Sequence, residues 1–109
     1  QGLDLGKVYE VITASAGNSW MFENRVPHVL AGDYTPLSSI EIFVKDLGIV
    51  QDMARSERYP VPLAAAALQM YLAASGAGMG RDDDSSLARL YAELSGAELP
   101  SSTKEPQSL

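Results

Sequence analysis

Residues 36–58 read PLSSIEIFVKDLGIVQDMARSER and predict the longest helix of the chain. The apolar residues of this segment recur at the three- and four-residue spacing of one helix face. They are Ile40, Phe43, Val44, Leu47, Val50 and Ala54. Thr35 is a good N-cap residue and precedes Pro36, which suits a first helical position, while Ser38 and Glu41 have the spacing of a capping box. We therefore expect a helix that begins near Pro36 and runs to the end of this segment.

The segments on both sides also have helical periodicity. A first amphipathic helix is expected to stop at Gly17. A second is expected to begin at Asn18 or Ser19 and to end at Gly32 and Asp33. Pro27 lies inside the second helix, where it removes a backbone donor, so we expect a kink or a break there. Further helices are expected from Pro62 and before Gly96.

The resulting fold class is all-α, because no segment alternates with period two for long enough to form a strand. We expect a compact bundle of about five to seven helices with one long central helix. Residues 1–100 are expected to form this domain, and the polar residues 101–109 a disordered tail.

The composition excludes several classes of protein. The net charge of −6 and the absence of a Lys/Arg cluster disfavour nucleic acid and anionic membranes as partners. The chain contains no run of about 18 apolar residues, so no membrane span is predicted. The chain has no cysteine, which excludes disulfide and thiolate chemistry and fits a cytoplasmic protein.

Common catalytic and binding motifs are weak or absent. The glycines of residues 76–80 follow a predicted helix rather than a strand, so a helix end explains them better than a phosphate loop. His28 is the only histidine, and no serine is placed beside it for nucleophilic catalysis. Three consecutive aspartates, residues 82–84, favour capping of the last helix over metal binding, and no metal site is predicted.

A charged pair, Lys45 and Asp46, interrupts the long apolar helix and precedes Gly48. A solvated helix face explains the charges in most proteins. Glycine inside a helix, however, costs about 1 kcal/mol relative to alanine. A closely approaching backbone or ligand would account for Gly48, and this makes the pair a candidate functional site.

The segment from Phe43 to Asp52 resembles the Lys-Asp-Leu-Gly-Leu-Ala signature of the 3-hydroxyisobutyrate dehydrogenase, or β-hydroxyacid dehydrogenase, family. Other pieces are similar to that family in the same order: GNSW at 17–20, GDYTP at 32–36, and Asp83 to Ser85 after the small-residue helix. The segment 18–25 looks most like the branch that oxidises L-threonate and related sugar acids.

The resemblance implies a helical C-terminal domain that closes on an N-terminal Rossmann domain and forms most of a dimer or larger oligomer interface. The catalytic lysine of the family and its NAD-binding loop would precede Gln1, so we expect no catalytic residue in this chain and no activity of the chain alone. Lys45 matches the lysine that contacts the nicotinamide end of NAD. Asp46 matches its active-site neighbour, and Ser38 stands where many members have a pocket phenylalanine. Ser38 and Trp20 are expected to line the pocket of a hydroxyacid substrate.

Two functions remain open at this point. The first is the substrate and dimerisation domain of an NAD-dependent dehydrogenase that acts on a hydroxyacid such as L-threonate. The second is a helical self-association module without chemistry of its own. Lys45 and Asp46 distinguish them, because a pure association domain does not need a charged pair beside a glycine in its central helix.

Overall fold

The computed structural model describes residues 2–100 and confirms the all-helical class for that part of the chain. The α-helices are α1 (Leu5–Thr13), α2 (Trp20–Ala31), α3 (Ile40–Ser56), α4 (Pro62–Ala74) and α5 (Leu87–Ser95). A π-helical turn, η1 (Ser75–Met79), and a 3-10 turn, η2 (Asp84–Ser86), connect α4 to α5. The predicted tail, 101–109, lies outside the described residues.

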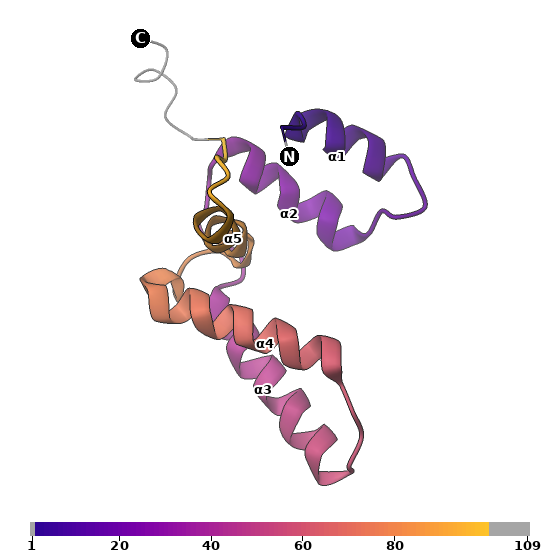
Figure 1. The fold of residues 1–109 in the computed structure, drawn as a ribbon, viewed down its shortest axis with the longest axis vertical. Helices are drawn as coiled ribbons and strands as arrows, with labels where there is room; N and C mark the ends of the chain where they lie inside the picture. Colours follow the sequence, from indigo (N-terminus) through magenta and orange to yellow (C-terminus); the bar gives the residue numbers. More distant parts are fainter. Residues whose placement is uncertain (1, 101–109) are drawn as a thin grey trace.

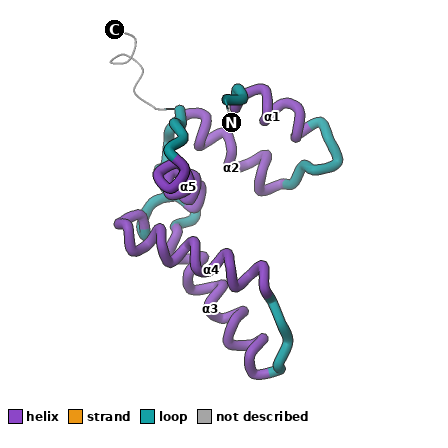
Figure 2. The backbone as a smooth tube through the Cα atoms, in the orientation of Figure 1, coloured by secondary structure: helices purple, strands orange, loops and turns teal. Residues whose placement is uncertain are grey.

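The helices are arranged as two hairpins, α1–α2 and α3–α4, with α5 between them (Figure 1). The loop at 14–19 closes the upper hairpin on its right side, and the loop at 57–61 closes the lower hairpin at the bottom of the view (Figure 2). The principal extents are 55 × 34 × 25 Å and the radius of gyration is 15.6 Å. A compact domain of this length has a radius of gyration of about 13 Å, so the chain is elongated.

The predicted helix ends of α2, α4 and α5 are confirmed. Ser19 caps α2, where its Oγ accepts a hydrogen bond of 2.9 Å from the Phe22 N–H. Gly32 and Gly96 follow α2 and α5 in the left-handed conformation, with φ of 65° and 77°. Pro62 occupies the first turn of α4. Of the kink or break predicted at Pro27, the break is wrong, because α2 continues through it as one helix.

The predicted start of α3 is wrong. The helix begins at Ile40, with Ser39 as its N-cap and no hydrogen bond from a capping side chain. The N–H groups of Ile40 and Glu41 instead donate to the carbonyl oxygens of Asp82 and Gly80, each at 3.0 Å. Backbone from a distant turn thus satisfies the donors that a capping box would have satisfied.

A small apolar core lies where α3, α4, η1 and α5 meet. Ile40, Ala74, Met79 and Leu90 are buried there. Phe43 on α3 stacks on Tyr71 of α4, with ring centroids 5.1 Å apart. The alanine-rich helix α4 packs along α3. Among residues 2–100, no helix has both the length and the apolar content needed to cross a membrane.

Candidate functional site

Lys45 and Asp46 lie on the exposed face of α3. Their side chains are 69% and 56% exposed, and the Lys45 Nζ is 3.6 Å from an Asp46 carboxylate oxygen. At this distance and exposure the pair is a weak surface contact, so the ammonium is available to another partner. Apolar side chains surround the pair on the same face. They are Ile42, Ile49, Val50 and Met53, each at least 40% exposed.

Gly48, one turn after Lys45, has open space where a side chain would project. A Cβ built on Gly48 would meet no heavy atom within 4 Å. The expected close neighbour of this glycine is therefore not another part of residues 2–100. Anything that approaches α3 closely at Gly48 comes from outside the described chain.

Ser38 and Trp20 lie in different parts of the molecule. Ser38 is in the connector before α3, half-buried, and its carbonyl oxygen accepts a hydrogen bond of 2.6 Å from the Asp84 N–H. Trp20 begins α2, is 67% exposed, and lies 5.8 Å from the Arg25 guanidinium carbon. A contact of this geometry is a cation–π interaction. Three surface hollows are found among residues 2–100, and none of them is lined by Ser38, Trp20 or Lys45.

A buried polar cluster, which the sequence analysis did not identify, joins α2 to the segment before α5. We call it the junction cluster: Arg25, His28, Asp83, Asp84 and Ser85. The Arg25 Nε donates to Asp84 Oδ1 at 2.7 Å, and the His28 Nδ1 lies 3.0 Å from Asp83 Oδ2. Asp83 also accepts from the N–H groups of Leu37 at 2.9 Å and Ser85 at 3.1 Å, and from the Ser85 hydroxyl. The aspartates therefore do more than cap the last helix, because their contacts join α2, the connector before α3 and the segment before α5.

The environment shifts the pKa values of the two junction aspartates in opposite directions. Burial alone would raise the pKa of Asp83, but the hydrogen bonds from Ser85, Leu37 and His28 outweigh it and hold that pKa well below the usual range. Burial dominates at Asp84 and raises its pKa, although the hydrogen bond from Arg25 opposes this. One Asp84 oxygen, Oδ2, is buried without a hydrogen-bond partner in the structure. Asp83 is therefore a buried carboxylate whose charge is stabilised by hydrogen bonds, whereas the charge of Asp84 is destabilised by its burial.

His28 takes part in this cluster and is not placed as a catalytic base. Its ring is held against the fully buried Asp83, an arrangement that orients the ring and ties α2 to the rest of the fold. No group of three or more metal-binding side chains converges within residues 2–100. The glycines of 76–80 form a helix end and turn, as expected, with Gly78 at φ 95°.

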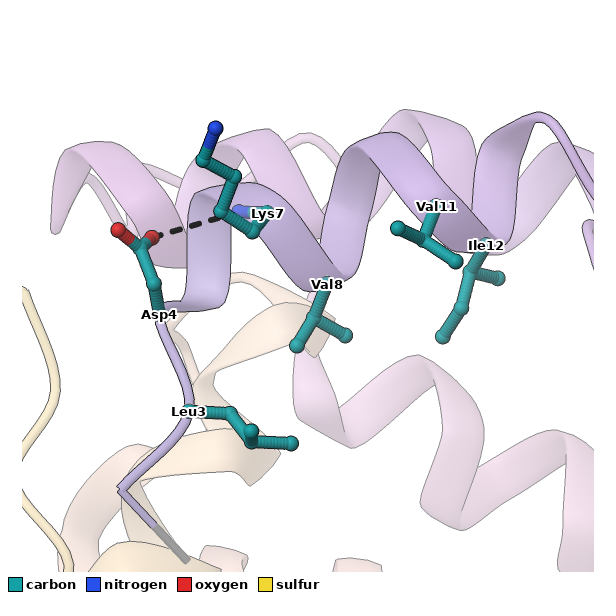
Figure 3. Close-up of a pocket in the computed structure, with 6 residues that line it drawn as sticks. All are labelled: Leu3, Asp4, Lys7, Val8, Val11 and Ile12. Atoms are coloured by element: carbon teal, nitrogen blue, oxygen red, sulfur yellow. Dashed lines mark hydrogen bonds between the residues drawn. The ribbon is translucent and has the colours of Figure 1, made fainter.

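Open apolar hollows lie on α1 and at the far end of the α3–α4 hairpin. The first has a volume of about 320 Å³ and lies over α1 (Figure 3). Leu3, Val8 and Ile12 project to one side of α1 there, while Lys7 points to the other (Figure 3). Two more, each of about 400 Å³, share Ala54 and Tyr59 near the α3–α4 loop. These hollows leave apolar helix surface without a neighbour in the described chain.

The fold and these sequence features define a member of a known dehydrogenase family. The family model described as "NAD-binding of NADP-dependent 3-hydroxyisobutyrate dehydrogenase" matches residues 1–91, and the chain belongs to this family. This confirms the predicted resemblance and a nicotinamide cofactor for the family.

The relatives confirm the predicted branch. An L-threonate dehydrogenase of Cupriavidus necator is 59% identical over 100 residues, which are 92% of this chain and 33% of that protein. One from Escherichia coli K12 is 52% identical over 99 residues, 91% of this chain and 32% of that protein. A crystal structure described as 3-hydroxyisobutyrate dehydrogenase from Salmonella typhimurium matches with a TM-score of 0.80 and 55% identity, over 82% of this chain and 31% of that chain. The chain thus spans about a third of the length of these relatives.

Proposed function

We propose that this chain is the helical C-terminal part of an NAD-dependent dehydrogenase that oxidises L-threonate or a related hydroxyacid. The observation that carries the proposal is the identity of 50–59% to L-threonate dehydrogenases over nearly the whole chain. In the proposed enzyme the catalytic lysine and most cofactor contacts lie outside these 109 residues. Bound NAD would accept the hydride from the hydroxyl-bearing carbon of the substrate.

Lys45 is the residue that we propose for the cofactor. Its weakly held ammonium is a strong hydrogen-bond donor, which suits the amide at the nicotinamide end. The open space at Gly48 supports close approach of another body on the same helix. Asp46 would neighbour this contact, and Ser38 and Trp20 would contribute pocket wall for a polyhydroxylated acid.

The exposed side chains of α3 and α1 support two partners for the domain: the cofactor-binding domain of the same enzyme and a second copy of the chain. Apolar helix faces of this extent are typical of surfaces that another layer covers. The exposure of Lys45 and Asp46 also supports the second candidate function, a self-association module, because neither residue lines any of the three hollows.

The first experiment uses this chain within a polypeptide of the relatives' length. Lys45→Ala should raise the KM for NAD at least tenfold while the melting temperature changes little, because the side chain is exposed and makes only a weak pair. Lys7→Ala is the matched control, since it removes an exposed lysine on α1. The 109-residue chain alone should produce no NADH with any hydroxyacid.

Unchanged kinetics for Lys45→Ala would contradict the role of this lysine. Turnover by the isolated chain would contradict the proposal that the catalytic lysine and most cofactor contacts lie outside these 109 residues. A full-length protein that folds but neither binds NAD nor turns over an acid would favour the self-association module.

A further inference from the structure

The α1–α2 hairpin has its own internal contacts. Tyr9 on α1 stacks on Phe22 of α2, with ring centroids 6.0 Å apart. The Tyr9 hydroxyl donates a hydrogen bond of 3.0 Å to the carbonyl oxygen of Glu23. These contacts hold α1 to α2 without help from the rest of the molecule.

The hairpin meets the rest of the chain over a narrow region. The main contact of α2 outside the hairpin is with η2, and the connector 32–39 is the covalent link to α3 (Figure 1). Val29 is the only buried residue of α2, and α1 has none. Little apolar burial is therefore available to fix the hairpin in place.

The junction cluster supplies the fixed contacts instead. Arg25 and His28 lie three residues apart on α2 and so share a helix face. They bind the consecutive residues Asp84 and Asp83, whose side chains are 3% and 0% exposed. Two adjacent, oriented side-chain contacts on a single face restrain rotation as well as separation, which one contact would not do.

We propose that the contacts of Arg25 with Asp84 and of His28 with Asp83 form a latch that holds the α1–α2 hairpin as a separately releasable unit. When the latch is closed, the position of Trp20 relative to the helix that bears Lys45 is set. When it is open, the hairpin moves on the connector 32–39, with its internal contacts intact. Arg25 and Asp84 are positioning residues in this scheme, and their link to catalysis rests on the proposed function.

The test measures the hairpin directly, in the 109-residue chain. Hydrogen–deuterium exchange is followed in the wild type, in Arg25→Gln and in the control Arg55→Gln, which alters an exposed arginine on α3. We expect Arg25→Gln to speed exchange at least tenfold in the connector 32–39, where the Leu37 N–H donates to Asp83, with the helical amides of α2, α3 and α4 unchanged. Arg25→Lys, which keeps the charge, should restore much of the protection.

A distance measurement provides the second readout. The chain has no cysteine, so spin labels can be attached at Lys7→Cys on α1 and Gln69→Cys on α4, both exposed. The distance distribution should be narrow with the native latch and broad with Arg25→Gln. A distribution of unchanged width, exchange that rises equally in all helices, or a wild-type chain without protection in any helix would each overturn the proposal. Neither measurement uses cofactor or substrate, so failure here is distinguishable from failure of the proposed function.

Discussion

Asp83 is the residue on which most of the junction depends. Its carboxylate is fully buried and accepts hydrogen bonds from α2, from the connector before α3 and from the turn before α5. A buried carboxylate without partners is strongly unfavourable, whereas one with several donors is stable. The lowered pKa of Asp83 is the electrostatic consequence of this arrangement.

The lowered pKa gives a testable dependence of stability on pH. Because the folded pKa of Asp83 lies below the ordinary value of 3.8, its contribution is fully present above about that pH and is lost as the pH falls through the folded pKa. The raised pKa of Asp84 has the opposite sign, so protonating it relieves a cost before pH 3.8 is reached. We expect the urea midpoint to hold or rise slightly from pH 7 to about 4 and then to fall.

Asp83→Asn should lower the free energy of unfolding at pH 7 by about 2–3 kcal/mol, because it leaves buried donors poorly paired. It should also flatten the loss of stability below pH 4. Asp52→Asn, which alters an exposed carboxylate on α3, is the control and should retain the acid limb. An acid limb of wild-type steepness in Asp83→Asn would show that other groups govern the acid transition.

At the scale of elements, the π-helical turn η1 contains two glycines, Gly76 and Gly78, whose backbone conformations differ. Gly76 and Gly78 both have open space where a Cβ would project, but only Gly78 has a positive φ, 95°. Gly78→Ala should therefore destabilise the chain by about 1–2 kcal/mol, through backbone strain alone. Gly76→Ala should be neutral or stabilise by up to about 1 kcal/mol, since it reduces the freedom of the unfolded chain. Thermal melts of the two variants check this, and equal effects would contradict it.

The helices themselves follow from local signals, and for that reason most were predictable. Ser19, Gly32, Pro62 and Gly96 act on their immediate neighbours, so their spacing sufficed. The start of α3 was mispredicted because its first donors bind the backbone of the turn at 80–82, some forty residues away.

The junction cluster lay beyond sequence reasoning for a similar reason. His28 and Asp83 are 55 residues apart, and nothing local indicates that they pair. One signal was available: three consecutive aspartates exceed what a single helix end requires. Lys45 and Asp46 were singled out by their position beside Gly48 and by a resemblance to a family motif, and their roles stay predictions.

At the scale of the whole molecule, the elongated arrangement leaves α3 with apolar residues on both sides. One side packs on α4. The other presents an exposed apolar stripe of α3, defined as Ile42, Ile49, Val50 and Met53. A two-helix layer cannot cover both faces of its own helices, so a further layer is needed. The candidates are the two partners that the proposed function names: a second copy of the chain, and the cofactor-binding domain, which would approach Lys45 on the same face.

Self-association through this stripe makes stability depend on concentration, since binding that is restricted to the folded state raises the melting temperature by mass action. Ile49→Glu, which places a charge in the middle of the stripe, should abolish the dependence and shift the sedimentation coefficient to that of a monomer. Gln69→Glu adds the same charge on the exposed face of α4 and should leave both unchanged. A wild-type chain that sediments as a monomer, with a melting temperature independent of concentration, would assign the stripe to a different partner. The cofactor-binding domain would then be the remaining candidate, because it is the other body that the proposed enzyme brings to α3.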